Sequence, residues 1–237
     1  MIPLLVLAVA AVMIAVERRG IGRPWPRVRG WWGRALLLNG VQFGTAYLAT
    51  STWDVWMAGH RPWQLPLGTT GQTLVGYVVI TFLYYWWHRW RHEVSFLWRW
   101  FHQIHHSPRR IEVITAFYKH PVEILVNGLI SSTILYFLVG VSPLAASQAV
   151  LITGLAELFY HWNVSTPRWI GFLIQRPESH CVHHQEGLHH YNYADLPLWD
   201  MCFRTFRNPP RFDATCGLGE EAELRMGAML RGVAVSE

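Results

Sequence analysis

Eight histidines gather in three short clusters, and this pattern constrains the fold of the chain more than any other feature. Residues 88–106 contain two clusters, His88-Arg-Trp-Arg-His92 and His102-Gln-Ile-His105-His106. The third is His180-Cys-Val-His183-His184. Helical residues three and four apart share one face, so we expect each cluster to point its imidazoles in one direction. A structural zinc takes four ligands, so eight histidines predict two metal ions, or one metal ion surrounded by further histidines.

The composition of the chain is typical of a membrane protein. Hydrophobic residues make up 51% of the 237 residues and charged residues only 15%, against about 25% charged in ordinary soluble proteins. The 14 tryptophans fit a chain that meets membrane interfaces. The net charge of +5 does not predict nucleic-acid binding, because the arginines flank apolar segments and form no stripe. The three cysteines form no CxxC pair, which indicates free thiols in a reducing compartment.

Five apolar segments predict an all-α integral membrane protein with about four to five transmembrane helices. The first segment is slightly short for a span, and its arginines follow it, unlike those of a signal peptide. We expect one membrane domain with three parts. These are N-terminal helices and a basic connector in 1–71, a catalytic region in 72–208 and a C-terminal tail in 209–237. The five segments are 1–16, 35–58, 72–87, 121–140 and 144–161.

Charge gives the orientation of these spans independently of the histidines. If the spans alternate, nineteen of the twenty basic residues fall on one side of the membrane, and Arg61 alone lies on the other. Cytoplasmic loops carry the excess of lysine and arginine. The same side holds every clustered histidine, so we expect a multi-pass protein with a helical cap and its metal site on the cytoplasmic face.

The chemistry of imidazole limits which metal ions the histidines could bind. Neutral imidazole suits iron, zinc, copper and nickel. Two redox-active irons could activate dioxygen, whereas two zincs would act as Lewis acids or generate hydroxide. A site at the ends of membrane spans could receive a lipid from between them, which favours dioxygen chemistry on a lipid.

The clusters and their surroundings resemble the fatty acid hydroxylase/sterol desaturase superfamily of membrane di-iron oxygenases. That family carries HxxxH, HxxHH and a later HxxHH, and the run from His88 to Glu93 is similar to the version in alkylglycerol monooxygenase-type members. His161 resembles a lone histidine that relatives place at the end of their last span. Asn192-Tyr193 and Leu198-Trp199-Asp200 match a segment that follows the third cluster. The similarity covers about residues 75–208.

This resemblance implies a ligand set, a reaction and partners. The reaction is the O2-dependent hydroxylation or desaturation of a lipid at two iron ions, which zinc can replace on expression. A separate ferredoxin- or cytochrome b5-like protein would supply the electrons, since the sequence has neither GxGxxG nor CxxCH. Sterol, fatty acyl, ether lipid, carotenoid and sphingolipid substrates all remain open. The nine implied ligands are His88, His92, His102, His105, His106, His161, His180, His183 and His184.

Three further residues are candidates for catalytic or supporting roles. Glu93 ends the first motif and is expected to support a ligand, the alternative being a solvated helix residue. Glu157 is a carboxylate within a span, and such groups are functional candidates by default. It would be a ligand or would orient His161. His120 is expected beside the substrate or the ligands, and Asp195 and Asp200 either accept from ligand histidines or cap turns.

Three other functions compete with the oxygenase. A histidine-lined metal transporter predicts ligands at both membrane faces, whereas the clusters share one face. A zinc-dependent membrane lipid hydrolase needs fewer histidines and usually a catalytic carboxylate. A non-catalytic scaffold predicts degenerate motifs, whereas all three clusters are intact.

Overall fold

The computed structural model describes residues 2–20 and 22–235, and over these ranges it is helical. Within them the only β pairing is an isolated bridge between Gln185 and Cys216. The expected all-α class is therefore confirmed for the part of the chain that the structure describes.

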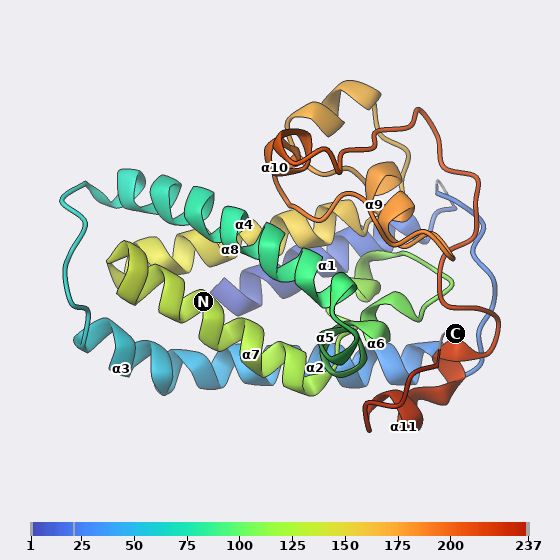
Figure 1. Ribbon diagram of the computed structural model, residues 1–237, viewed down its shortest axis with the longest axis horizontal. Helices are drawn as coiled ribbons and strands as arrows, with labels where there is room; N and C mark the ends of the chain where they lie inside the picture. The colour runs from blue at the N-terminus through green and yellow to red at the C-terminus, as the bar shows by residue number, and fades with distance from the viewer. Residues whose placement is uncertain (1, 21, 236–237) are drawn as a thin grey trace.

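Long helices lie side by side along the long axis of the molecule and form its body (Figure 1). The π-helix η3 (Thr133–Val139) continues α7, and the short α3 (Trp53–Gly59) follows α2. Two segments, Pro121–Val139 and Pro143–Tyr160, are long and apolar enough to cross a membrane, and Leu4–Glu17 is a shorter apolar helix. The long helices are α1 (Ile2–Glu17), α2 (Trp31–Ser51), α4 (Thr69–Glu93), α7 (Pro121–Ser132) and α8 (Pro143–Tyr160). Four to five spans remain a prediction.

Helices α4 and α8 pack closely because small residues line their contact. A Cβ atom at Gly76 would lie 3.0 Å from a methyl carbon of Leu135 and 3.7 Å from the Cβ of Ala149. Ala145 and Ala149 are fully buried on α8. Small side chains let helix backbones approach each other, which holds the two helices that lead to the histidines in a fixed relation.

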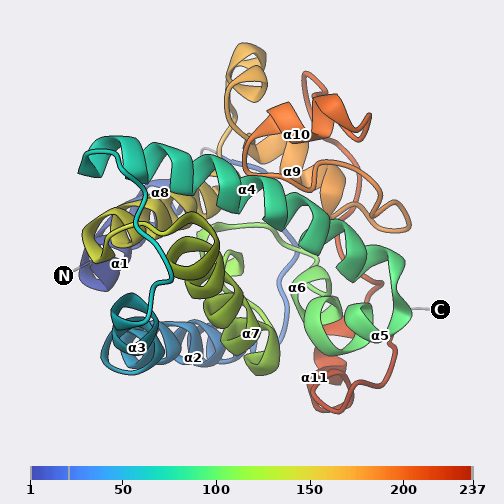
Figure 2. The same ribbon diagram turned by 60° about the vertical axis from the view of Figure 1, so that its left-hand side comes forward.

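Short helices gather at one end of the long helices and form a cap (Figures 1 and 2). This is the end at which α4 ends and α7 begins. The cap contains α5 (Ser95–Leu97), η1 (Trp98–His102), α6 (Gln103–His106), η2 (Val113–Thr115), η4 (Arg168–Phe172), α9 (Pro177–His183), α10 (Pro197–Cys202), η5 (Ala222–Arg225) and α11 (Met226–Met229).

The C-terminal residues belong structurally to this cap. Met229 is fully buried and packs in a cluster with Trp31 and Tyr118. The buried Glu223 carboxylate accepts from Arg34 Nη2 at 2.6 Å and from the Arg109 backbone N–H at 3.1 Å. The segment that the sequence suggested as a tail therefore joins the start of α2 to the loop after α6.

Candidate metal centre

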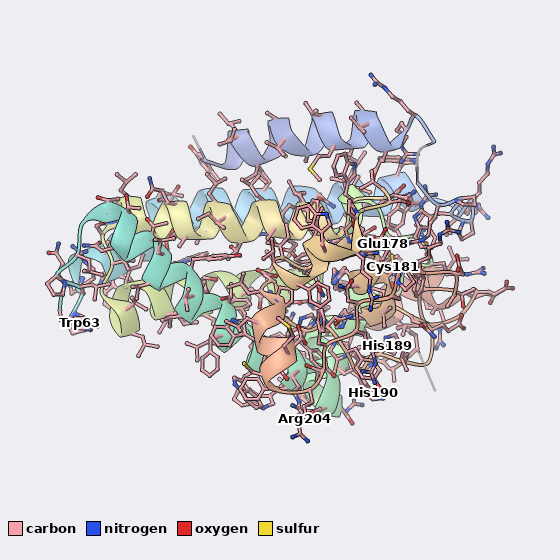
Figure 3. All side chains as sticks on the ribbon, turned by 90° about the horizontal axis from the view of Figure 1, so that it is seen from above. Trp63, Glu178, Cys181, His189, His190 and Arg204 are labelled. Carbon is pink, nitrogen blue, oxygen red and sulfur yellow. The ribbon has the colours of Figure 1, made fainter. Side chains whose placement is uncertain are left out.

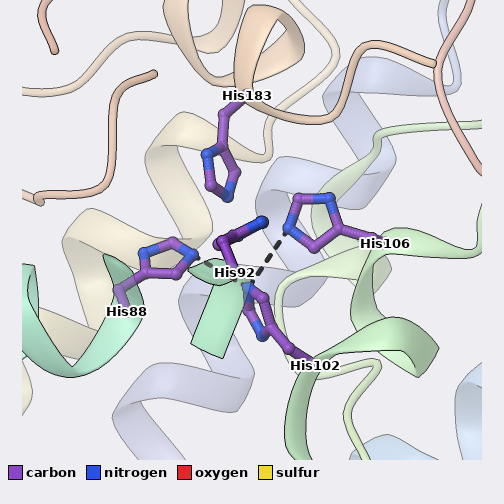
Figure 4. A group of neighbouring side chains, drawn as sticks. All are labelled: His88, His92, His102, His106 and His183. Carbon is purple, nitrogen blue, oxygen red and sulfur yellow. Dashed lines mark hydrogen bonds between the residues drawn. The ribbon is translucent and has the colours of Figure 1, made fainter. Parts of the chain in front are cut away.

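The structure brings all nine histidines of the expected ligand set into two adjacent groups. Within each group, one ring nitrogen from every histidine lies within 4.8 Å of the others. Figure 4 shows the five-histidine group, whose imidazoles converge from α4, from the η1 and α6 segment, and from α9. That group is His88, His92, His102, His106 and His183, and the four-histidine group is His105, His161, His180 and His184.

The two HxxHH clusters do not each point in one direction, which corrects the expectation from helical spacing. His102 and His106 join the five-histidine group, whereas His105 between them joins the four-histidine group. The third cluster divides the opposite way, since His180 and His184 join the four-histidine group and His183 joins the five-histidine group. Residues i and i+4 share a direction, and residue i+3 lies far enough round the helix to reach the neighbouring group.

Distances between ring nitrogens fit metal coordination. In the five-histidine group, His102 Nε2 lies 2.9 Å from His88 Nε2 and 3.1 Å from His106 Nε2. In the four-histidine group, His180 Nε2 lies 3.0 Å from the Nε2 atoms of His161 and His184. Ligands bonded at about 2.1 Å lie about 3.0 Å apart when they meet at right angles and about 3.4 Å apart when tetrahedral. The four spacings are close to the right-angle value, so the nitrogens of each group are near enough to share a metal ion.

Burial keeps the clustered imidazoles in the form that binds metal. Desolvation lowers the pKa of His102, His106 and His180 well below the usual 6.5, and repulsion from neighbouring cations and imidazoles lowers it further. Neutral histidine is the metal-binding form. Among the described residues, Nε2 of His92 and Nε2 of His183 are buried without a hydrogen-bond partner. An unpaired buried nitrogen is costly unless it has a ligand, so these atoms fit a bound cation.

Backbone carbonyls orient three of the imidazoles. The Nδ1–H group of His88 donates to the Tyr193 carbonyl at 2.6 Å, and that of His183 donates to the Tyr191 carbonyl at 2.7 Å. His161 Nδ1–H donates to the Glu157 carbonyl at 2.8 Å. A donor bond from Nδ1 fixes the tautomer and leaves the Nε2 lone pair free for a metal.

Asp200 supports this arrangement through the backbone. Its carboxylate accepts from the backbone N–H groups of Tyr193 at 2.8 Å and Ala194 at 3.0 Å, and from the Thr205 hydroxyl at 2.7 Å. Of the two roles expected for Asp200, the structure shows the turn-capping role. Asp200 thereby holds the carbonyl group that orients His88. Asp195 lies elsewhere, on the wall of a cavity below the histidines.

A buried ion pair that the sequence analysis missed lies against the five-histidine group. Arg91 and Glu123 form a salt bridge, and Glu123 Oε1 lies 3.2 Å from His102 Nδ1. Both side chains are 5% exposed or less. Charged residues in apolar surroundings were the available signal, because Arg91 lies inside the first motif and Glu123 begins an apolar helix.

The three other candidates lie outside both groups. Glu93 is half exposed and pairs with Arg89 at 2.7 Å, so the expectation that it supports a ligand finds no support in the geometry. His120 caps α7 by accepting from the Val122 backbone N–H at 3.0 Å, which gives it a structural role. The Glu157 carboxylate pairs with Lys119 on the cavity wall. Its backbone carbonyl, not its carboxylate, orients His161.

His189, which belongs to none of the three clusters, lies close to the five-histidine group. Its ring centroid is 5.0 Å from that of His106 and 5.6 Å from that of Trp98. Its neighbour His190 is exposed. Figure 3 shows both in the cap, far from Trp63 at the other end of the molecule. His189 packs against the five-histidine group without belonging to it.

A cavity of about 340 Å³ extends from the histidines into the body of long helices. His88, His102, His105 and His180 line its metal-facing end. Most of the remaining wall comes from α1, α2, α4, α7 and α8, with smaller parts from α3, η3 and neighbouring loops, and its surface is mostly apolar. The arrangement places a mostly apolar cavity against both histidine groups.

Comparisons with known proteins agree with this site. The fatty acid hydroxylase family model matches residues 73–205, which is more than half of the chain and includes all nine histidines. No solved structure matches.

Three curated relatives are similar over part of their length. Human alkylglycerol monooxygenase is 29% identical over 65% of this chain and 34% of its own length. Very-long-chain aldehyde decarbonylase GL1-4 from Oryza sativa subsp. indica is 29% identical over 76% of this chain and 29% of its own length. Ornithine lipid hydroxylase OlsE from Rhizobium tropici is 32% identical over 61% of this chain and 44% of its own length. The chain thus spans less than half the length of each relative.

Proposed function

Because the chain belongs to the fatty acid hydroxylase family, we propose that it is a membrane-bound oxygenase that hydroxylates or desaturates a lipid at a di-iron centre. It uses O2 and takes electrons from a separate donor protein. The observation that carries this proposal is the pair of adjoining, buried histidine groups at the end of an apolar cavity. Relatives named for lipid hydroxylation and lipid monooxygenation support the substrate class.

The donor set favours iron in both groups. Nine neutral nitrogen ligands and no carboxylate make up the two groups found among the described residues. Imidazole binds iron well, and spacings near 3.0 Å suit coordination by more than four ligands. Two irons would supply the redox chemistry that activates dioxygen.

The protein's own residues hold and orient the lipid. The cavity wall aligns an apolar chain along α4 and α7 and brings one carbon to its metal-facing end, beside His102 and His105. Positioning of this kind fixes which carbon reacts.

The charge pattern supports a cytoplasmic cap. Exposed arginines on the cap would attract an acidic electron donor, since complementary charge speeds encounter. They include Arg27, Arg29, Arg99, Arg211 and Arg225.

The competing functions fit less well. A zinc hydrolase usually employs a catalytic carboxylate, and neither histidine group contains one. A transporter would need a path of ligands through the membrane, whereas both groups lie at the cap end of the helices.

Metal content and oxygen uptake test the proposal together. The wild-type protein should bind two irons per chain and consume O2 with a lipid substrate, and His105→Ala should abolish uptake. His60→Ala is the matched control, because this exposed histidine bonds only its own helix at Trp56. Lipid mass spectrometry of cells expressing each protein identifies the product. An iron-loaded wild-type protein that yields no oxygen-dependent product from any lipid class would refute the proposal.

A further inference from the structure

An exposed apolar surface lies on one side of the cap, on η4 and α10. On α10, Leu198 and Met201 are 49% and 39% exposed, and they lie three residues apart on one face. On η4 and the residue after it, Trp169, Phe172 and Leu173 are 63%, 49% and 64% exposed and share a face by the same spacing. The two helices pack against each other, which places these exposed side chains on neighbouring elements. A patch of this kind marks an interaction site.

The opposite face of α10 fixes it beside the middle of α4. Trp199 Nε1 donates to the Thr81 hydroxyl at 3.2 Å, and its ring lies 5.0 Å from that of Phe82. Phe203, just after α10, packs 4.8 Å from Trp86. Thr81 precedes His88 by seven residues, which is about 10 Å along a helix. This side of the cap therefore lies beside the middle of α4, and not only at the end that carries His88 (Figure 1).

Basic side chains border the apolar surface. Arg168 starts η4, and Arg204 and Arg207 follow α10, and all three are exposed. Figure 3 shows Arg204 at the edge of the molecule. A face of Trp, Phe and Leu with arginine beside it is typical of protein surfaces that lie at the boundary between lipid headgroups and acyl chains.

We propose that η4 and α10 form a membrane-surface anchor, whose apolar face inserts into the headgroup and acyl boundary beside α4. Its exposed arginines bind anionic lipid phosphates. The inference rests on the proposed membrane-bound function and on the transmembrane span expected at residues 72–87, which lie in α4. Lipid is the proposed occupant because α10 packs on α4, and α4 exposes Leu74 at 57% and Val78 at 44% within the expected span.

The anchor would also hold the metal centre at a fixed height above the bilayer. The chain leading into α10 contains Tyr193, whose carbonyl orients His88, and Asp195, which lines the cavity. Asp200 within α10 caps that turn. A lipid-seated α10 therefore connects the membrane surface directly to the cavity wall.

A native cysteine allows the test. Cys202 on α10 is exposed, whereas Cys181 and Cys216 are buried, so a thiol-reactive fluorophore labels the anchor in the full-length protein. The labelled protein is reconstituted in vesicles of phosphatidylcholine and phosphatidylglycerol that carry nitroxide spin labels near the top of the acyl chain. We expect strong quenching at Cys202. Two control sites in a Cys202→Ser background are Leu74→Cys on α4 and Val233→Cys near the C-terminus.

Each outcome is decisive. Quenching at positions 202 and 74 but not at 233 supports the anchor. Quenching at 74 without quenching at 202 overturns it and leaves the spanning helices intact, and no quenching at 74 contradicts the membrane orientation itself. Energy transfer between labelled copies without lipid quenching would assign the surface to a second copy of the chain and would overturn the lipid anchor. In a Trp169→Ser/Leu173→Ser variant with an unchanged circular dichroism spectrum, quenching at Cys202 should be largely lost.

Discussion

The rings of His106 and His184 stack with their centroids 4.2 Å apart and their planes 17° from parallel. His106 belongs to the five-histidine group and His184 to the four-histidine group. The stacked pair thus forms the contact between the two proposed metal positions, although the residues lie 78 positions apart in the chain. The two proposed positions are therefore adjacent, as the proposed dinuclear centre requires.

Removal of His184 should therefore weaken metal binding beyond its own group. In His184→Ala the four-histidine group loses a nitrogen, and His106 loses the ring that fixes its plane. We expect the iron content per chain to fall to half or less, as measured by elemental analysis of the purified protein. His190→Ala is the control, because this neighbouring histidine is exposed and lies outside both groups. Equal iron loss in both variants would contradict the assignment.

Loss of the buried Arg91–Glu123 pair should destabilise the protein far more than loss of the exposed Arg89–Glu93 pair. Both arginines lie on α4. In Arg91→Met the Glu123 carboxylate stays buried without its partner, a change that typically costs about 3–5 kcal/mol. In Arg89→Met the partner is the half-exposed Glu93, and such surface pairs contribute about 0–1 kcal/mol. Thermal unfolding in detergent should give a much lower Tm for Arg91→Met than for Arg89→Met. Similar Tm values would show that the inner pair is not buried as described.

Asp200 should control metal affinity without contacting the metal. In Asp200→Ala the Tyr193 and Ala194 backbone N–H groups lose their acceptor, and the carbonyl that orients His88 becomes less fixed. Loss of such support typically lowers metal affinity about 10–100-fold. Competition with a chelator measures this affinity, and Asp213→Ala, which changes an exposed aspartate, is the control. An unchanged affinity in Asp200→Ala would refute the connection.

Acidification should destabilise the metal-free protein. Burial holds the pKa of His105 and His184 well below 6.5 and that of His183 at about 3, whereas the unfolded chain takes up protons near 6.5. Below pH 6.5 the unfolded state therefore binds more protons, and the free energy of unfolding falls as pH falls. The Tm of the metal-free protein should be flat above pH 7.5 and decline between pH 6.5 and 5. His105→Leu should show a shallower decline, and an equal slope would contradict the prediction.

Much of the site could be predicted because its ligands are local patterns. His88 and His92, or His102 and His106, share a direction through helix geometry alone, and their type predicts metal binding. The helices also follow from apolar segments, and α8 ends at Tyr160, directly before His161, where the sequence placed the end of a span. Glu93 and His120 became candidates through their motif positions alone. In the structure Glu93 pairs with Arg89 and His120 accepts from the Val122 backbone N–H, and both lie outside the histidine groups.

The sequence by itself determined the helical class, the set of nine histidines and their gathering at one end of the long helices. The helical class and the three clusters follow from residue type and short-range periodicity. His161 entered the set through the family resemblance, and the common side followed from the charge pattern. Only the tertiary structure decided how the nine histidines divide, with His105 and His183 each joining the group opposite to its neighbours, and how His106 meets His184. It also decided that Glu123 supports His102 and that α10 lies beside α4. These contacts join residues far apart in the chain. They depend on how the helices pack, and the local sequence pattern does not encode that packing.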